Sequence, residues 1–433
     1  MPAPARKQAI GPALAVLFLV NVLNFYDRQA LGAVLEPLRH EFRLSDTELG
    51  ALTTIFTVIY AVAGLPLGRL ADTGSRRRLL AWGVTAWASL TGLGGLARSY
   101  AMLMATRLGV GIGEAVCAPA ATSWIGDLVP ANRRARAMAG FMMAVPVGGM
   151  LSLAITGPMA QAHGWRAALA LAALPAAALA PAVWWLREPA RGRAAGAEAP
   201  PELPLSLLKI PALWWIAASG AIVNFVLYSF STFLPAFLTR YHGLPVGRAG
   251  VWAGVGSGVA GILGAIAAGV YGDRVIRRYG NGRLLLAAAA SLAAVPLAWA
   301  AIGQPAGSAA AAVALIMPAY GLLQMYYGLV YAAMHDIVPP SLRGTAMAAY
   351  FLVTYLGGAA FGPLATGMLS DYFARRAAAL VTTAEAARAM GLHQAMYAIP
   401  ALSLVLAGVL WGGARAMGAR RGRNGGEALG KSA

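Results

Sequence analysis

The stretch Asn24-Phe25-Tyr26-Asp27-Arg28 places an acid and a base inside an apolar run that extends from about residue 9 to residue 38. A run of this length is long enough to cross a bilayer, which takes about 20 residues of helix. Ionisable side chains at that depth cost on the order of 2.5–3.5 kcal/mol each on insertion scales, and they usually serve a function and face an opposite charge. Asp27 and Arg28 therefore predict functional charges within a membrane span, with a structural ion pair that orients helices as the alternative.

The composition of the whole chain indicates a membrane protein with many spans. Its 433 residues are 59% hydrophobic and 12% charged, with a mean hydropathy of +0.64, whereas soluble proteins carry about 25% charged residues. No small-residue cleavage site follows the first apolar run, so we expect a retained span rather than a signal peptide. Hydropathy predicts twelve spans, at residues 9–38, 47–71, 79–97, 101–126, 137–161, 166–186, 211–239, 247–272, 284–302, 308–335, 345–370 and 392–414.

The formal net charge of +18 is distributed as a topology signal. Of the 34 lysines and arginines, 23 lie on the side of the two termini and 9 on the opposite side, while Arg28 and Arg107 lie within spans. The positive-inside rule then predicts that both termini are cytoplasmic, in the inner membrane of the cell. No basic patch with interleaved aromatic residues stands apart from the membrane flanks, so we expect no nucleic-acid partner.

Motifs for catalysis or for metal binding are not found in the sequence. Cys117 is the single cysteine, which excludes an intramolecular disulfide and offers no metal cluster. The run Gly256–Gly261 matches the dinucleotide pattern G-x-G-x-x-G, but it has no preceding strand and lies in a span, so we reject that interpretation. We therefore expect no enzyme, no metal site and no organic cofactor.

Two sequence patterns recur along the chain and indicate a duplicated six-span unit. Gly68 and Asp72, followed by an arginine pair, return as Gly269 and Asp273 at an offset of 201 residues. Residues 127–130 and 134–149 return in part at an offset of 209. We predict an N-terminal six-helix bundle at 1–186, a cytoplasmic linker at 187–210, a C-terminal six-helix bundle at 211–416 and a disordered basic tail at 417–433.

These features resemble the major facilitator superfamily, whose transporters have two six-helix halves around a midplane site that opens alternately to each side. An acid at a helix end beside the N-terminus of another helix is favoured by the helix dipole, which predicts that the paired loop motif latches the halves on the cytoplasmic side. Thr73 and Ser75 depart from the family's motif, so we expect a weaker first latch; a merely solvated loop is the alternative. The latch residues are Gly68, Asp72, Arg76, Arg77, Gly269, Asp273, Arg277 and Arg278.

The N-terminal half also resembles the spinster subfamily of these transporters. The matching stretches are Asn24–Arg28, Arg107–Ala115, Ala144–Gly148 and Arg187–Pro189. This resemblance implies an amphipathic anionic substrate such as a lysophospholipid or a sphingoid phosphate. Organic-anion/proton symporters share the pattern of the first span and imply a small organic acid instead.

Four deep charges form the candidate coupling site. Arg107 and Glu114 are seven residues apart, about two helical turns, so they share a helix face. Burial and a nearby guanidinium act in opposite directions on the protonation of a carboxyl group, which makes Asp27 the first candidate for a proton carrier and Glu114 its partner. We predict that Arg107 anchors an anionic headgroup, since its planar fork suits phosphate or carboxylate, and that Arg28 is a counter-charge. Fixed ion pairs that never titrate are the alternative.

Deep polar residues of the C-terminal half are neutral and rich in tyrosine. We predict that they line a substrate site together with Asn24 and the arginines, with interhelical packing as the alternative role for the tyrosines. These residues are Asn224, Tyr228, Tyr320, Gln324, Tyr327 and Tyr355. The sequence thus predicts a secondary active transporter, monomeric and coupled to protons, for an amphipathic or small organic anion. A non-transporting membrane sensor on the same fold is a further alternative.

Overall fold

The computed structural model describes residues 10–189, 207, 210–339 and 342–430, and within these ranges the regular elements are helices, with no strand. In the described residues, ten helical stretches, some of which join consecutive helices, are long and apolar enough to cross a membrane. One of them, Arg136–Trp185, holds two of the predicted spans, because α8 (Ala144–Trp185) bends at Gly164, whose φ of 83° interrupts the helix. A further predicted span coincides with α4 (Arg76–Gly94), which begins with three arginines and falls outside the ten.

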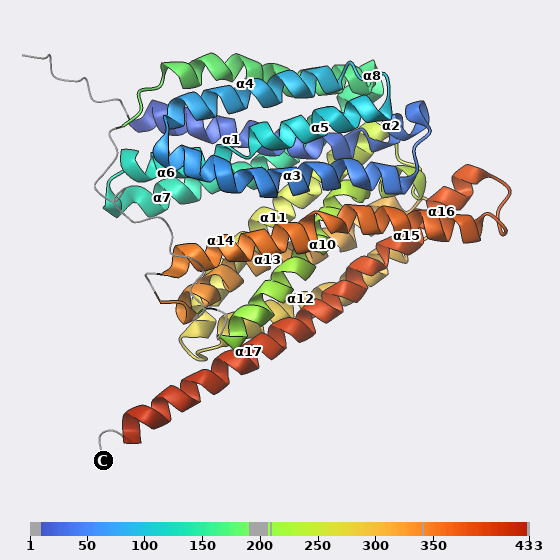
Figure 1. The fold of residues 1–433 in the computed structure, drawn as a ribbon. Coiled ribbons are helices and arrows are strands. Elements are labelled where there is room, and N and C mark those ends of the chain that lie inside the picture. The colour runs from blue at the N-terminus through green and yellow to red at the C-terminus, as the bar shows by residue number, and fades with distance from the viewer. Residues whose placement is uncertain (1–9, 190–206, 208–209, 340–341, 431–433) are drawn as a thin grey trace, which may run out of the picture. The chain divides into compact units, whose positions relative to one another are not determined.

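The chain divides into two units (Figure 1). Unit 1 contains residues 1–44, 55–197 and 245–255, and unit 2 contains residues 45–54, 198–244 and 256–433. The predicted halves at 1–186 and 211–416 therefore each give up one short segment to the other unit. Both segments begin the second helix of their half, namely α3 (Asp46–Thr73) and α11 (Val246–Ile276). The interior of the predicted linker lies outside the described residues.

Unit 1 is built from helices that pack alongside α1 and α4 (Figure 1). The helices of this unit that have not been given above are α1 (Ile10–Ala33), α2 (Leu35–Phe42), α5 (Tyr100–Glu114), α6 (Cys117–Leu128) and α7 (Ala131–Met142). Serine N-caps start two of the main helices: Ser75 accepts from the third residue of α4, and Ser99 does so for α5.

The contact between α1 and α8 is close because α8 presents a glycine there. A Cβ on Gly148 would collide with the backbone oxygen of Val22 and come within 2.9 Å of the Phe25 Cβ. One and two turns further along α8, the Ser152 hydroxyl donates to the Tyr26 carbonyl at 2.6 Å, and Thr156 bonds to the Tyr26 hydroxyl at 3.0 Å. These contacts fix α1 at the residue before Asp27. Small residues allow such close approach between membrane helices.

Unit 2 places its helices around α10 (Pro211–Arg240) and α17 (Ala398–Gly430). The remaining elements are α12 (Gly282–Ile302), α13 (Ala309–Ile337), α14 (Arg343–Thr354), the π-helix η3 (Tyr355–Ala359), α15 (Phe361–Ala377) and α16 (Ala384–Met396). In the structure α17 continues to Gly430, within the segment 417–433 for which the sequence predicts a disordered tail. Glycine, a poor helix former, is the most frequent residue of that segment, and disorder of the tail stays a prediction.

Candidate functional site

The four deep charges of unit 1 come together on α1 and α5. Arg28 Nε donates to Glu114 Oε2 at 2.8 Å, and Arg107 Nη1 lies 3.6 Å from Asp27 Oδ2. The side chains are 7% exposed or less, so both pairs are shielded from solvent. Each arginine therefore faces the acid of the other helix. The predicted cluster is present, and its pairing is crossed between the two helices.

Aromatic rings surround the Arg28 guanidinium. Its central carbon lies 4.0 Å from the ring centre of Tyr60, 4.8 Å from that of Phe25 and 5.6 Å from that of Phe56. A guanidinium over an aromatic face gains about 0.5–2 kcal/mol, most when it is desolvated. Tyr60 and Phe56 lie on α3, and sequence reasoning missed them because aromatic residues in an apolar span carry no distinguishing signal.

Several polar atoms in this cluster have no hydrogen-bond partner within the described part of the chain. They are Asn24 Nδ2, both carboxyl oxygens of Asp27, Glu114 Oε1 and Arg107 Nε. Leaving a buried polar group unsatisfied costs about 1–3 kcal/mol, so a set of five is a costly arrangement for a purely structural site.

The two acids of the cluster also lie close to each other. The carboxyl groups of Asp27 and Glu114 are near enough to interact. Two ionised carboxylates only accept hydrogen bonds, so the donors that this site offers them are the guanidinium groups of Arg28 and Arg107.

Helix ends and breaks position these side chains. Glu114 is the last residue of α5, and the chain turns at Ala115 and Val116 before α6 begins. Gly113, next to Glu114, packs against α4, where a Cβ would lie 3.0 Å from the Trp87 nitrogen. The Glu114 carboxylate is therefore held by a tightly packed helix end, while its partner Arg28 is held by aromatic faces.

The predicted polar residues of the C-terminal half lie in unit 2, where the structure joins them in small groups. Tyr327 donates to Asn224 Oδ1 at 3.2 Å, and Gln324 Nε2 donates to the Tyr320 hydroxyl at 2.9 Å. The rings of Tyr228 and Tyr355 lie edge to face, 6.2 Å apart. These six side chains gather on α10, α13 and η3, and a role in substrate binding remains a prediction.

Two further tyrosines of unit 2 have a structural role. The Tyr326 hydroxyl bonds to Ser219 at 2.8 Å and to the Tyr350 hydroxyl at 3.1 Å. Tyr326 is 1% exposed and Tyr350 is 4% exposed, so this chain of hydroxyls lies in the interior. These two residues are not among the predicted site residues, and their hydroxyl groups join α10, α13 and α14.

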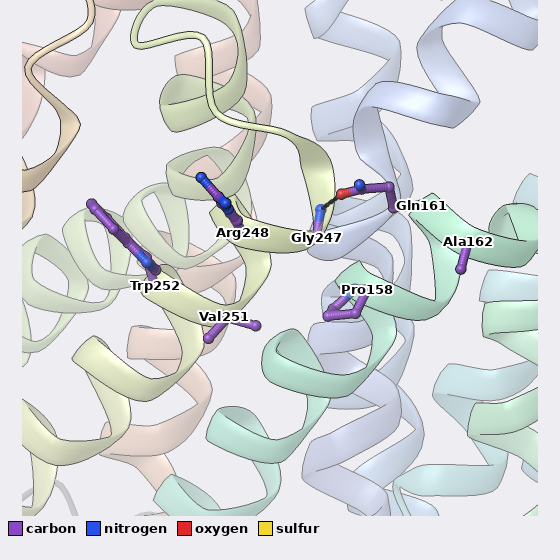
Figure 2. Close-up of a pocket in the computed structure, with 7 residues that line it drawn as sticks. All are labelled: Pro158, Gln161, Ala162, Gly247, Arg248, Val251 and Trp252. Carbon is purple, nitrogen blue, oxygen red and sulfur yellow. Dashed lines mark hydrogen bonds between the residues drawn. The ribbon is translucent and has the colours of Figure 1, made fainter.

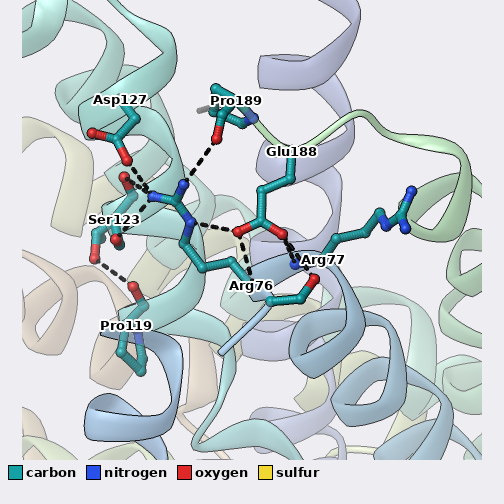
Figure 3. Close-up of polar contacts among 9 residues, drawn as sticks. Arg76, Arg77, Pro119, Ser123, Asp127, Glu188 and Pro189 are labelled. Carbon is teal, nitrogen blue, oxygen red and sulfur yellow. Dashed lines mark hydrogen bonds and ion pairs between the residues drawn. The ribbon is translucent and has the colours of Figure 1, made fainter. Parts of the chain in front are cut away.

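Arg76, a predicted latch residue, is buried in a network inside unit 1 (Figure 3). Its guanidinium binds Glu188 Oε1 at 3.0 Å and Asp127 Oδ2 at 2.5 Å. Glu188 also accepts from the backbone nitrogens of Arg76 and Arg77 and from the Ser75 hydroxyl, so it caps the N-terminus of α4. Burial on its own would raise the pKa of Glu188, but the hydrogen bonds from Ser75 and Arg76 outweigh it and lower this pKa.

In unit 2, the two acids of the repeated segments lie near the same arginine, Arg283, which is not one of the predicted latch residues. Arg283 binds Asp336 at 2.6 Å and lies 3.7 Å from Asp273. Arg277 and Arg278 are exposed, as is Asp72 in unit 1. The two glycines of the motif, Gly68 and Gly269, would accept a Cβ without a close contact. Latching between the two halves stays a prediction.

A buried charge network at the beginning of α3 was missed by sequence reasoning. In unit 2, Asp46 binds Arg240 at 2.7 Å and Ser370 at 2.5 Å, and the pair is 3–4% exposed. Asp371 on α15 accepts from the backbone nitrogens of Asp46 and Thr47 and from the Thr47 hydroxyl. These charges stand at span ends, where charged residues are common, so the sequence gives no sign that they are buried.

Comparison with known proteins identifies the fold and its relatives. The family model described as Major Facilitator Superfamily matches residues 17–363. An "MFS-type efflux pump" of Mycolicibacterium smegmatis is 32% identical over 370 residues, which cover 83% of this chain and 84% of the relative. "Protein spinster" of Drosophila melanogaster is 27% identical over 388 residues, covering 85% of this chain and 64% of the relative.

A solved structure is similar over almost the whole chain. It is a bacterial homologue of the human lysosomal transporter Spinster in an inward-facing and unoccupied conformation. The two chains superpose with a TM-score of 0.83 at 27% identity, over 95% of this chain and 98% of the other. The matched fold and the matched motifs agree on one family.

Proposed function

This chain belongs to the major facilitator superfamily, as a spinster-like multi-pass membrane transporter and not an enzyme, and from this premise we propose that it couples a proton to the movement of an organic anion. The observation that carries the proposal is the crossed pairing of Asp27 with Arg107 and of Glu114 with Arg28. The net charge of the two acids and the two arginines is zero when all four side chains are ionised. Any proton that binds therefore leaves one arginine without its counter-charge.

Coupling follows from that balance. A proton on Asp27 removes the charge that faces Arg107, 3.6 Å away, and the buried guanidinium then favours an anion in its place, because an unpaired buried charge is costly. An anionic headgroup and a proton would thus load together. When the proton leaves, the Asp27 carboxylate again competes for Arg107 and expels the headgroup. The proton is the coupling ion, and no other cofactor is needed.

We propose an amphipathic substrate, of the lysophospholipid or sphingolipid type. Support comes from the similarity to spinster proteins and from the tyrosine-rich set on α10 and α13, whose rings offer apolar faces together with hydroxyl groups. A small organic acid, moved by an organic-acid/proton symporter, is the alternative. A small-acid symporter would transport its substrate at a rate that does not depend on whether the substrate has an acyl chain.

Membrane orientation and oligomeric state are part of the proposal. The 23 to 9 distribution of basic residues supports cytoplasmic termini and a cytoplasmic linker, and we propose a monomer in the inner membrane of the cell. A cysteine introduced at Gly196, which lies outside the described residues, should react only with reagents that reach the cytoplasm. The native Cys117 is 1% exposed and gives little background. Labelling of Gly196→Cys from outside intact cells would reverse the orientation.

The test of coupling uses the purified full-length protein in proteoliposomes, with a lysophospholipid and a short carboxylate as substrates. Asp27→Asn mimics a permanently protonated carboxyl group, so uptake driven by a pH gradient should be lost while substrate exchange at equal pH continues. Arg107→Ala removes the headgroup anchor, so binding itself should weaken, and more for anionic than for neutral ligands. Glu36→Gln serves as the control, since Glu36 is a buried acid on α2 outside the cluster.

The outcomes separate the roles of the two acids. Full gradient-driven uptake by Asp27→Asn would make Glu114 the proton carrier, which Glu114→Gln then checks in the same assay. If both acids can be neutralised without loss of gradient-driven uptake, the protein is a facilitator and proton coupling is refuted.

A further inference from the structure

A groove of about 550 Å³ lies in unit 1 where the first turns of α11 meet α8, just before the bend at Gly164 (Figure 2). Gln161 Oε1 accepts from the Gly247 backbone nitrogen at 2.7 Å and joins the two helices. Figure 2 shows Arg248 and Trp252 projecting from one face of α11. The groove is lined by Pro158, Gln161, Ala162, Gly247, Arg248, Val251 and Trp252.

The duplication gives this groove a counterpart in unit 2. At the offset of 201 residues, Gly247 and Arg248 stand where the first half has Asp46 and Thr47. At the offset of 209 residues, Gln161 and Ala162 correspond to Ser370 and Asp371. The structure supports this correspondence, because each pair joins the beginning of the second helix of one half to the fifth span of the other.

The two copies differ in charge. In unit 2, Asp46 and Asp371 supply two carboxylates, which bind the helix beginning, Ser370 and Arg240. In the groove of unit 1 both acids are replaced, one by Gly247 and the other by Ala162, and an arginine is added. Arg248 is exposed and forms no ion pair with any residue that the structure describes. The groove therefore carries a positive charge, whereas the corresponding place in unit 2 carries two carboxylates that bind residues of their own unit.

We propose that this groove binds the headgroup phosphate of an anionic phospholipid from the surrounding bilayer. The guanidinium of Arg248 suits a phosphate through paired hydrogen bonds. Trp252 follows one turn further into the apolar helix, and tryptophan is enriched at the depth of the headgroups. Val251 and Pro158 give the groove an apolar wall for the glycerol and the first methylenes. This lipid stays bound to the protein, so the inference does not depend on the transported substrate.

The test is native mass spectrometry of the delipidated full-length protein, titrated with dioleoylphosphatidylglycerol, with dioleoylphosphatidylcholine and with glycerol 3-phosphate. The wild type should retain one phosphatidylglycerol in preference to phosphatidylcholine. Arg248→Gln should weaken its retention by about tenfold, as expected for the loss of one charge-assisted contact. Ala162→Asp should do the same with Arg248 in place, because it restores the internal carboxylate of the other copy. Arg98→Gln, which changes an exposed arginine outside the groove, should have no effect.

Two results would overturn the proposal. One is unchanged preference for phosphatidylglycerol in both Arg248→Gln and Ala162→Asp, each checked for an unaltered melting temperature. The other is equal binding of glycerol 3-phosphate, which would identify a site for a free phosphate rather than a lipid. The transport-deficient Asp27→Asn variant should keep the lipid, so a failure of proton coupling and a failure of this site give different results.

Discussion

Removal of the Asp46 carboxylate should destabilise the protein strongly, and the buried network of unit 2 sets the size of the effect. Asp46 binds Arg240 at 2.7 Å, with side-chain exposures of 4% and 3%, so solvent screens the pair very little. Breaking a buried ion pair by removing one partner costs about 3–5 kcal/mol, because a charge is left without compensation in a medium of low dielectric. Asp46→Ala should therefore lower the free energy of unfolding by about that amount.

The double variant separates the charge effect from packing. Replacing both members of a buried pair with apolar residues is often neutral or even stabilising, so Asp46→Ala combined with Arg240→Met should regain most of the loss. The assay is equilibrium unfolding in mixed detergent–SDS micelles, followed by tryptophan fluorescence, for the wild type, both single variants and the double variant. The coupling energy from this cycle should be at least about 2 kcal/mol.

A matched control comes from the exposed pair in unit 1. Glu41 binds Arg166 at 2.6 Å, but these side chains are 39% and 44% exposed, and exposed pairs contribute about 0–1 kcal/mol. A coupling energy at Asp46 and Arg240 as small as that at Glu41 and Arg166 would refute the reasoning that burial makes the network strong.

Three other predictions concern packing, pH and the charged loops of unit 2. Gly148→Ala should destabilise the protein much more than Gly149→Ala, since the added Cβ meets the Val22 backbone in one case and only the Gln29 side chain, at 3.7 Å, in the other; equal melting temperatures would contradict this. The pKa of Glu188 is lowered in the folded state, so the ionised carboxylate stabilises the protein at neutral pH, and this stabilisation is lost as the pH falls below the ordinary pKa of 4.5. The melting temperature of Glu188→Gln should therefore change less between about pH 7 and pH 4 than that of the wild type. An unchanged pH dependence of the melting temperature would exclude this role of Glu188. Asp336→Asn should cost more stability than Asp273→Asn, since Asp336 binds Arg283 at 2.6 Å while Asp273 is 73% exposed and 3.7 Å away; the reverse order would show that the exposed acid carries the interaction.

The charged cluster could be predicted because its residue types stand out against their surroundings. Asp27, Arg28, Arg107 and Glu114 are conspicuous in apolar spans, and the seven-residue spacing of the last two sets a common helix face. The crossed pairing could not be predicted, since it depends on how α1 and α5 are rotated about their axes. That rotation is set by contacts such as Gly148 on Val22, which no local pattern specifies.

The duplication was visible in the sequence, but its effect on packing was not. The offsets aligned Arg76 with Arg277, whereas the arginine that binds the acids of unit 2 is Arg283, at the start of α12. Likewise, Asp46, Arg240 and Asp371 stand at the ends of spans, where hydropathy expects charged residues next to water. Burial of Asp46 and of the Arg240 side chain results from contacts between helices far apart in the sequence, such as α3 and α15.

The exchange of helix beginnings between the two units constrains how the protein is made. Residues 245–255 complete unit 1, although the rest of that unit has left the ribosome before they are translated. Residues 45–54, in turn, are among the first to be synthesised and join a unit whose other parts follow more than 140 residues later. The nascent N-terminal half must therefore wait in the membrane, with the face of α8 that carries Gly157 uncovered, until α11 arrives to pack against it. A chain that ends in the linker would lack the partners of both the beginning of α3 and the Gly157 face of α8. We expect such a fragment to expose these two surfaces and to be degraded by quality-control proteases.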